Sequence, residues 1–333
     1  MIINYILLKF VQTLGIRGKE QQQVRWNPNS KPALGGISFY VIFLFAFIVT
    51  IFISEKSNTI NLRLSGILIA GTLAFVMGLA DDAFNTQPLL KFLTQVICGF
   101  VLIATGHSIG IFQNDFLNYI LTVLWVVGFM NSINMLDNMD GISTIVSICI
   151  CLFTILLNIT LMQTKSYASI LSIGLLGALC GFLIYNFHPS KMFMGDTGSQ
   201  FLGLFLACMG IDNCWNTDLQ SDFNFNHTIL NFLIVALVFL IPLVDTITVI
   251  INRLKAGNSP FVGGKDHTTH HLFFKGITEK RIAILYFLIS SIGVFIAYRL
   301  IISFSTTLMY IGFSFALLVF ITLYLNTVIK REK

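Results

Sequence analysis

Long runs of apolar residues alternate with short polar segments along the whole chain. Most of these runs are long enough for a helix to cross a hydrocarbon core of about 30 Å. The predicted transmembrane helices are residues 2–15, 35–54, 61–80, 88–106, 116–131, 142–163, 167–186, 198–211, 228–251, 281–302 and 306–327. The first and the eighth are short for a bilayer span. The pattern predicts an all-α fold, a polytopic integral membrane bundle of about eleven transmembrane helices.

Composition separates the chain from soluble domains. Of its 333 residues, 56% are hydrophobic, 11% are charged and 32 are Phe. We expect one membrane-embedded domain over residues 1–333, with a polar loop at 252–280 that contains histidines. The N-terminal run has no small-residue cleavage site, which favours a first transmembrane helix over a signal peptide. No basic block with interleaved aromatic residues is present, so no nucleic-acid partner is expected.

The distribution of basic residues predicts the orientation in the membrane, because cytoplasmic loops carry an excess of Lys and Arg. With the N-terminus outside and the C-terminus inside, fifteen of the 20 basic residues are cytoplasmic: Arg17, Lys19, Arg25, Lys31, Lys91, Lys191, Arg253, Lys255, Lys265, Lys275, Lys280, Arg281, Lys330, Arg331 and Lys333. The outer side holds Lys56, Arg63, Lys165 and Arg299, and Lys9 falls within the first span. We therefore expect an N-out, C-in protein of the inner (plasma) membrane.

In this topology all four polar segments fall on the cytoplasmic face. They are Asp81-Asp82, residues 131–141, residues 186–199 and residues 253–280. The outer loops carry no concentrated pattern, and their acids are expected to be solvated. Those acids are Asp115, Asp212, Asp218 and Asp222. A functional site is therefore predicted on the cytoplasmic face.

The segment at 131–141 reads NSINMLDNMDG and has the highest density of polar side chains. Asn131, Asn134, Asp137 and Asp140 are spaced three residues apart, which can place several oxygen ligands on one side of a helix end or tight loop. A surface turn also uses Asn, Asp and Gly, but it needs only three or four of them. We interpret this segment as the centre of the site.

Asp81 and Asp82 directly follow an apolar run. Adjacent carboxylates at a membrane boundary repel each other and are partly desolvated, so a bound cation or a nearby Lys should compensate them. An acidic cap beside a helix is the simpler interpretation of an isolated Asp-Asp pair. Lys91 begins the next run, and it either faces the same site, where it suits a phosphate, or anchors the helix end.

Gly195 and Gly198 bracket Asp196 and Thr197 immediately before another apolar run. Glycines at a helix N-terminus let backbone N–H groups approach an anion, and Asp196 can hold a cation there. An Asp or Thr N-cap with a glycine turn is the alternative. His188, earlier in this segment, is expected to be structural.

The last polar segment follows the ninth run. Pro242 is predicted to kink that span, and Asp245, inside the span near its cytoplasmic end, is a functional candidate. Beyond it, His267, His270 and His271 have a spacing that converges on one helix face. Zinc binding is one interpretation, although no cysteine or fixed carboxylate completes the site. Binding of a polyanion such as a pyrophosphate and a solvated connector are the other two.

Together these segments offer acids, amides, bases and histidines on one face. Mg²⁺ prefers hard oxygen ligands and is usually held by one or two protein groups plus substrate phosphates. Such a site at a membrane surface indicates phosphoryl transfer from a water-soluble substrate to a lipid carrier. A membrane transporter, the non-enzyme alternative, predicts ionisable residues at the midplane and paired broken helices. The clustering of polar segments at span ends favours the enzyme.

The motifs GLADDAFN, NSINMLDNMDG, NFHPSKMFMGDTGSQFLG and the DHTTHH loop resemble the polyprenyl-phosphate N-acetylhexosamine-1-phosphate transferases. KPALGGISF is similar to the KPxPxxGG segment of the same family. The motifs cover nearly the whole chain in the same order. HTTHH resembles the HxHH loop of the WecA/TagO branch more than the three consecutive histidines of the MraY branch.

The resemblance implies a reaction. UDP-N-acetylhexosamine, with GlcNAc as the expected sugar, and undecaprenyl phosphate would give undecaprenyl-diphosphate-sugar and UMP, with Mg²⁺ or Mn²⁺ as the metal. This reaction would initiate a cell-envelope glycan. UDP-MurNAc-pentapeptide or a modified UDP-hexosamine is the alternative donor. The sequence leaves the oligomeric state open, with a homodimer as one option.

The resemblance also implies roles for particular residues. The implied metal ligands are Asn134 and Asp196. The implied catalytic residues are Asp81, Asp82, Asp196, His270 and His271. The implied substrate-binding residues are Lys91, Asn131, Asp137, Asp140, Lys191 and His267. Asp137 and Asp140 would contact the nucleotide or maintain their loop.

Two features depart from the family pattern. Asn138 stands where many relatives have Gly, which leaves the roles of Asp137 and Asp140 open, and the first span is short. The implied nucleophile is a phosphate monoester whose second pKa is about 6, so it needs no strong base. Asp81 is therefore expected to matter more for orienting the lipid phosphate, or for completing the metal site, than for removing a proton.

Overall fold

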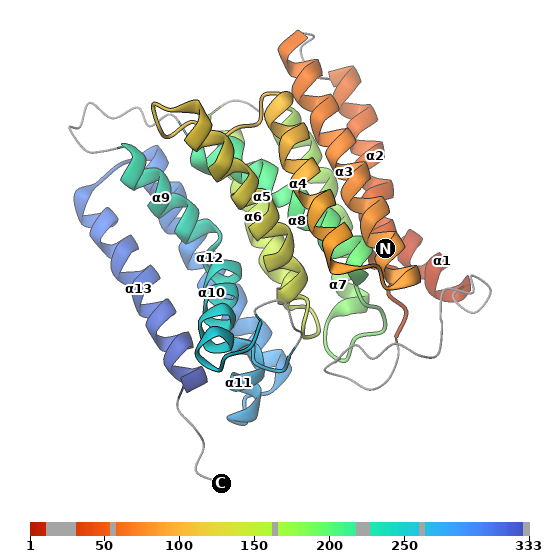
Figure 1. The fold of residues 1–333 in the computed structure, drawn as a ribbon, viewed down its shortest axis with the longest axis vertical. Coiled ribbons are helices and arrows are strands. Elements are labelled where there is room, and N and C mark those ends of the chain that lie inside the picture. The colour runs from red at the N-terminus through yellow and green to blue at the C-terminus, as the bar shows by residue number, and fades with distance from the viewer. Residues whose placement is uncertain (11–30, 54–57, 162–165, 218–226, 260–263, 329–333) are drawn as a thin grey trace.

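The computed structural model describes residues 1–10, 31–53, 58–161, 166–217, 227–259 and 264–328, which form a bundle of helices (Figure 1). The helices are α1 (Ile2–Phe10), α2 (Gly35–Ile53), α3 (Asn58–Phe84), α4 (Pro88–Ala104), α5 (Asp115–Leu136), α6 (Ile142–Thr160), α7 (Tyr167–Asn186), α8 (Gly195–Gly210), α9 (His227–Val238), α10 (Leu240–Lys255), α11 (Thr268–Phe274), α12 (Glu279–Ile302) and α13 (Thr306–Val328). A π-helix (Ile211–Trp215) continues α8. Within the described ranges the only β-pairing is a single bridge between Ala33 and Phe193. The predicted all-α fold is confirmed.

The helices have the length and composition of a multi-pass membrane protein. In the described part of the chain, 7 helices are long and apolar enough to cross a membrane: α2, α3 from Leu62 onward, α5, α6, α7, α12 and α13. The spans predicted at 88–106 and 198–211 correspond to the shorter α4 and α8, which have 17 and 16 residues. Only α1 represents the predicted span 2–15, since residues 11–15 lie outside the described ranges. The number of eleven transmembrane helices stays a prediction.

The predicted span at 228–251 is divided into two helices. α9 and α10 meet at an angle of 87°, a much sharper change of direction than a kink within one helix. Phe239 separates them, and Pro242 lies in the first turn of α10, where the missing N–H removes no intrahelical hydrogen bond. The bend directs α10, which carries Asp245, toward the polar end of the bundle.

α8 is the central helix. Every residue from Thr197 to Gly210 is buried, and the helix packs against α2, α3 and α5. A helix that is apolar on all sides needs such an enclosed position. A Cβ added at Gly78 of α3 would lie 2.3 Å from the Asp196 carbonyl oxygen, so this close approach requires glycine. The contact places the acidic end of α3 beside the start of α8.

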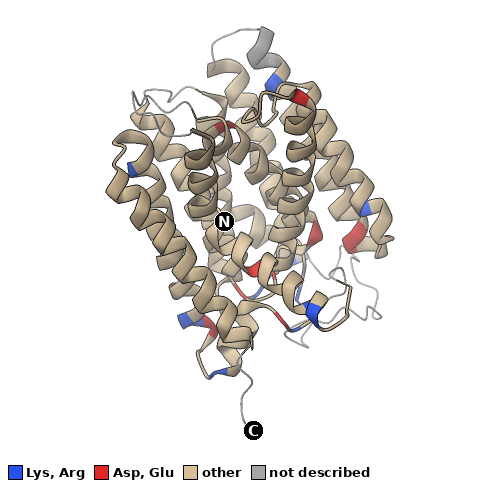
Figure 2. Ribbon diagram, turned by 60° about the vertical axis from the view of Figure 1, so that its left-hand side comes forward, with Lys and Arg blue, Asp and Glu red and all other residues tan. Residues whose placement is uncertain are grey.

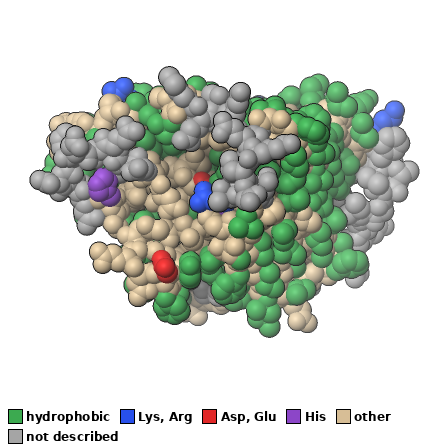
Figure 3. All heavy atoms as spheres, turned by 90° about the horizontal axis from the view of Figure 1, so that it is seen from above, with side chains coloured by type: hydrophobic (Ala, Val, Ile, Leu, Met, Phe, Trp, Pro, Cys, Tyr) green, Lys and Arg blue, Asp and Glu red, His purple; other side chains and the backbone are tan. Residues whose placement is uncertain are grey.

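All four polar segments lie at the end of the bundle where the C-terminus lies (Figure 1). Charged residues gather toward this end in the ribbon view of Figure 2. On the described surface of the opposite end, seen in Figure 3, charged side chains are few. The structure thus brings the four segments together, as the sequence predicts. That this end faces the cytoplasm stays a prediction.

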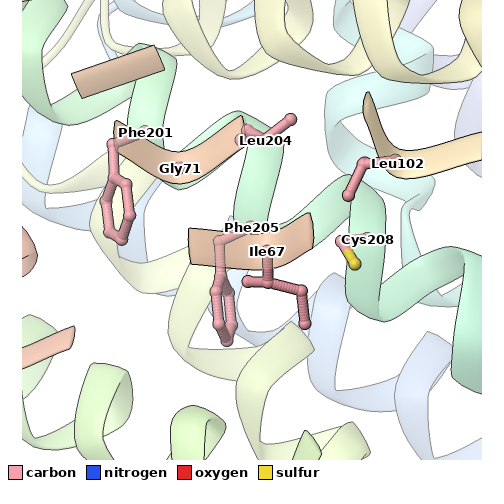
Figure 4. A pocket seen from close by; sticks show the side chains of 7 residues that line it. All are labelled: Ile67, Gly71, Leu102, Phe201, Leu204, Phe205 and Cys208. Atoms are coloured by element: carbon pink, nitrogen blue, oxygen red, sulfur yellow. The ribbon is translucent and has the colours of Figure 1, made fainter. Parts of the chain in front are cut away.

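An apolar crevice lies between α3, α4 and α8, away from the polar end (Figure 4). Its lining is Ile67, Gly71, Leu102, Phe201, Leu204, Phe205 and Cys208. The crevice has no room for a water molecule and, apart from the Cys208 thiol, offers only hydrocarbon. It is a feature of core packing and offers no site for a phosphorylated substrate.

Candidate active site

Lys91 joins two carboxylates that come from different helices. Its Nζ lies 3.3 Å from Asp81 Oδ2 and 2.9 Å from Asp196 Oδ2. The other oxygen of Asp81 accepts hydrogen bonds from the Thr86 N–H at 3.0 Å and from its hydroxyl at 2.6 Å. Lys91 is the fourth residue of α4, and it faces the site instead of serving only as a membrane anchor. This contact favours the first of the two alternatives that the sequence leaves open.

Asp82 holds the start of α8. Its Oδ1 accepts a hydrogen bond from the Asp196 N–H at 2.9 Å, and its Oδ2 accepts from the Thr197 N–H at 2.8 Å and hydroxyl at 2.7 Å. The first N–H groups of a helix lack partners within the helix and favour an anion. The anion at this helix N-terminus is therefore a side chain of the protein itself. Gly195, with a φ of 74°, makes the turn into the helix.

Asn134 meets Asp196 where α5 packs on α8. Its Nδ2 donates to Asp196 Oδ1 at 2.5 Å and to Ser199 Oγ at 2.8 Å. The two residues implied as metal ligands are therefore in direct contact. The amide nitrogen faces the carboxylate here, and a half-turn of the amide group would present its oxygen instead.

Asp137 is a carboxylate of this end that has no hydrogen-bond or ion-pair partner among the described residues. It immediately follows α5. Burial, followed by the negative charges of Asp196, Asp140 and Asp82, raises the pKa of Asp137 well above its ordinary value. Asp137 is half-buried, and a carboxylate that faces other carboxylates in this way is a position that a cation or a ligand's hydrogen-bond donor can complete.

The charges and ligand types of this end fit a divalent cation. Asp81, Asp82, Asp137 and Asp196 lie close together, and Lys91 is the positive side chain that contacts them within the described ranges. Carboxylate and amide oxygens are the ligands that Mg²⁺ prefers. The residues best placed to hold such an ion are Asp196, Asp137 and Asn134.

Asn131 is paired inside the bundle, one turn away from the acids. Its Nδ2 donates to Gln95 Oε1 at 2.8 Å, while Gln95 Nε2 donates to Asn131 Oδ1 at 3.2 Å and to Gln200 Oε1 at 2.9 Å. Three helices, α4, α5 and α8, are joined by this amide network, which fixes their relative positions. The sequence analysis missed Gln95 and Gln200. The available signal was their spacing, four residues after Lys91 and four after Asp196.

Asp140 is bound to the turn that precedes α8. Ser190 donates its N–H at 2.9 Å and its hydroxyl at 2.7 Å, and Lys31 Nζ lies 3.6 Å away. His188 Nδ1 lies 3.2 Å from Asp140 and 2.8 Å from Glu279 at the start of α12. Of the two roles expected for Asp140, nucleotide contact and loop maintenance, these contacts favour the second. They also give His188 the structural role expected of it.

The KPALGG segment braces the start of α8. The Gly35 N–H donates to the Phe193 carbonyl at 3.1 Å, and the Gly36 N–H donates to the Met194 carbonyl at 3.0 Å. This pairing explains how a motif far away in sequence contributes to the polar end. Lys191 is exposed in the same turn, where its side chain is open to a soluble substrate.

Asp245 anchors the histidine helix α11. Its Oδ2 lies 2.8 Å from His267 Nδ1, and its Oδ1 accepts from the Thr268 N–H at 2.9 Å and hydroxyl at 2.5 Å. Asp245 is only 1% exposed, and a buried carboxylate needs such partners. The sequence made Asp245 a functional candidate inside a span. In this structure Asp245 caps the N-terminus of α11.

The three histidines of this segment have different neighbours. The rings of His267 and His270 are edge-to-face with centroids 5.3 Å apart, whereas His271 lies against Phe274. Within the described ranges these histidines do not bring three metal-binding atoms together, so the zinc interpretation gains no support. Burial, followed by the proximity of His267, lowers the pKa of His270 to about 4, so its ring is neutral at neutral pH.

The opposite end contains a buried polar cluster that the sequence analysis missed. His107 Nδ1 lies 3.1 Å from Asp212 Oδ1, and its Nε2 lies 3.0 Å from the Arg63 carbonyl oxygen. The Tyr167 hydroxyl donates to Asp212 Oδ2 at 2.8 Å. The expectation that Asp212 is a solvated loop acid is wrong, because the fold encloses it with these partners. A lone His in a short polar connector gave no sequence signal for them.

The sequence profile of Glycosyl transferase family 4 matches residues 64–213. The chain is 28% identical over 270 residues to a probable undecaprenyl-phosphate N-acetylglucosaminyl 1-phosphate transferase of Bacillus subtilis (strain 168), covering 78% of this chain and 71% of the relative. It is 31% identical over 226 residues to a phospho-N-acetylmuramoyl-pentapeptide-transferase of Streptococcus agalactiae serotype Ia. These residues cover 61% of this chain and 67% of the relative.

A second phospho-N-acetylmuramoyl-pentapeptide-transferase, from Carboxydothermus hydrogenoformans, is 27% identical over 326 residues, which cover 89% of this chain and 92% of the relative. The matched residues 64–213 contain Asp81, Lys91, Asn134, Asp137 and Asp196, so the region of family similarity includes the core of the polar end. The chain therefore belongs to glycosyl transferase family 4 and is a multi-pass membrane member of it.

Proposed function

We propose that this protein transfers N-acetylhexosamine-1-phosphate, with GlcNAc-1-phosphate as the first choice, from a UDP-sugar to undecaprenyl phosphate. An oxygen of the lipid phosphate forms a bond to the β-phosphorus of the UDP-sugar. The bond between that phosphorus and the bridging oxygen breaks, and UMP leaves with the bridging oxygen. The names of the relatives, which describe transfer of a phosphorylated amino sugar, support this class of reaction.

The observation that carries the proposal is the acidic cluster together with Lys91, which contacts two of its carboxylates. The reaction brings two anionic substrates together, so the site must supply positive charge. Lys91 supplies part of it, because its ammonium already lies between Asp81 and Asp196. When bound by Asp196, Asp137 and Asn134, Mg²⁺ or Mn²⁺ would supply the charge that neutralises the diphosphate and the leaving UMP.

Asp81 is assigned to orientation. Both of its oxygens are engaged, one by Thr86 and the other by Lys91. The lipid phosphate is already ionised near neutral pH, since its second pKa is about 6. Asp81 therefore holds Lys91 in position for the lipid phosphate instead of removing a proton. Asp82 acts indirectly, because it fixes the start of α8.

The nucleotide and the sugar are assigned to the groups that remain open. Asp137 has no hydrogen-bond partner among the described residues, and an oxygen of its carboxylate that does not bind the metal can accept N–H or O–H donors of the nucleotide. His270 and His271 can donate hydrogen bonds to the diphosphate or the sugar without adding charge when neutral. Lys191 is exposed and can approach the soluble substrate. We place this end on the cytoplasmic face of the membrane, where the predicted excess of basic residues lies.

Purified protein, undecaprenyl phosphate and Mg²⁺, incubated with one UDP-sugar at a time, will test the proposal. UMP release with UDP-GlcNAc, lost on adding a chelator and regained with Mg²⁺ or Mn²⁺, is the expected result. Faster release with UDP-MurNAc-pentapeptide would assign the other donor. Absence of UMP with every donor would overturn the proposed function.

A further inference from the structure

Asn138 joins the central polar segment to the histidine helix. The Thr269 hydroxyl donates to Asn138 Oδ1 at 2.7 Å, and Asn138 Nδ2 donates to the Met135 carbonyl oxygen at 2.9 Å. The Asn138 backbone also lies close to the His270 ring. Two consecutive residues of α11, Thr269 and His270, therefore lie against one residue of the loop that carries Asp137.

The geometry fixes the direction of the Asn138 amide group. Met135 offers a carbonyl oxygen, which can only accept, so the amide nitrogen must face it. The amide oxygen is then left for the Thr269 hydroxyl. Thr269 is fully buried and His270 is 2% exposed. Water is therefore a poor substitute for these contacts if they are lost.

α11 depends on such contacts because it has seven residues, too few for an isolated helix to be stable in water. Asp245 holds its first turn through His267 and Thr268. Its other packing partners are α10, α12 and α13. Asn138 provides the link from α11 to the segment between α5 and α6.

We propose that Asn138 is a positioning residue of the transferase. It fixes α11 against the segment that carries Asn134 and Asp137, and so places the His270 ring for the diphosphate of the UDP-sugar. This inference rests on the proposed function of the same site. A glycine at this position would offer no side-chain acceptor for Thr269, so the link depends on the asparagine.

A double-mutant cycle tests the link. Asn138→Ala and Thr269→Val should each lower kcat/KM for the UDP-sugar by about 3- to 10-fold, the range of one hydrogen bond between neutral groups. The kcat/KM of the double variant should lie within about 2-fold of that of the less active single variant, because both changes remove the same bond. Independent, multiplying effects would overturn the proposal.

The chain offers a matched control. Asn252 Nδ2 donates to Thr327 Oγ1 at 2.8 Å, so the same pair of groups links α10 to α13. Asn252→Ala and Thr327→Val should leave kcat/KM within about 2-fold of the wild type. The Asn138 variants should raise KM for the UDP-sugar and leave KM for undecaprenyl phosphate unchanged. Equal changes in both KM values, or equal losses in the control, would indicate a merely structural residue.

Hydrogen–deuterium exchange separates this inference from the reaction itself. In the purified full-length protein, Asn138→Ala should speed exchange of the α11 amides at least 3-fold, and Asn252→Ala should leave them unchanged. If the α11 amides of Asn138→Ala exchange at the wild-type rate, Asn138 does not fix α11 and the proposal is overturned, even if the wild type is active. If the wild type releases no UMP, the proposed function fails, and the exchange experiment still decides whether Asn138 holds α11.

Discussion

The two ends of the bundle use similar side chains in opposite ways. At one end, Asp212 has His107 on one oxygen and Tyr167 on the other, and both ring nitrogens of His107 face acceptors. At the other end, Asp137 has no partner among the described residues, although Asp196 and further acids lie nearby. The first cluster is complete without a ligand, and the second is not.

We interpret this difference as one between polar groups that hold the fold and polar groups that bind a ligand. A fully paired buried network strengthens itself in a medium of low dielectric constant and fixes the helices around it. An unpaired carboxylate in the same medium costs stability. Such a cost is typical of functional sites, where the ligand supplies the missing partners of the polar groups. The predictions below test whether the two ends divide in this way.

The largest effect is expected for Asp196→Asn. The change keeps the size of the side chain, and it removes the charge that faces Lys91 and any bound cation. Turnover should fall by about 10²–10³-fold, since one electrostatic group in a preorganised site is commonly worth a factor of this size. UMP release measures the loss, and a thermal midpoint close to that of the wild type shows that the protein is folded. Near-normal turnover would refute the assigned role.

A smaller loss, about 10²-fold, is expected for Lys91→Met. The variant leaves Asp81 and Asp196 facing each other without their shared cation. Lys91→Arg, which keeps the charge and changes its shape, should recover part of the activity. Steady-state rates of UMP release for the two variants provide the comparison. Equal rates for both would show that positive charge at this position is unimportant.

Asp212→Asn should reverse the pattern at the opposite end. Breaking a buried ion pair from one side commonly costs about 3–5 kcal/mol, so the free energy of unfolding should fall by an amount of that order. Turnover per folded molecule should stay within about 2-fold of the wild type. Thermal unfolding in detergent and UMP release measure the two quantities. Loss of turnover with unchanged stability would contradict the assignment of the Asp212 cluster to the fold.

The smallest effect concerns Asp137→Asn. The raised pKa of Asp137 means that its contribution to stability is present below the pKa of the unfolded chain and is lost as pH rises through the folded pKa. Near neutral pH without divalent ions, the variant should therefore be more stable than the wild type by about 1 kcal/mol or more. The difference should vanish in acid, and Mg²⁺ should stabilise the wild type more than the variant. Thermal midpoints of both proteins across pH, with and without Mg²⁺, measure the stability difference and its dependence on the ion.

The sequence predicted the helices and the gathering of the polar segments because both depend on local patterns. Apolar runs of helical length must become helices in a membrane, and alternating spans return every second loop to the same end. Lys91 is a different case. The sequence left two roles open for it, because the choice depends on how α4 packs against α3 and α8.

Residues whose roles depend on distant partners were beyond the reach of these patterns. His107 and Asp212 are 105 residues apart, and neither carries a motif. Asp245 was singled out as an acid inside a span, but its cap of α11 depends on the 87° bend between α9 and α10. Such pairings are set by tertiary packing, which a single sequence does not display.

The most direct test of the central claim follows the β-phosphate. Purified protein is incubated with undecaprenyl phosphate, Mg²⁺ and UDP-GlcNAc labelled in the β-phosphate, and with Asp196→Asn as the inactive control. We expect the label in a lipid-extractable diphosphate product together with unlabelled UMP, at a rate that Asp212→Asn does not change. Label released in UDP would show transfer of the sugar without its phosphate and would contradict the account.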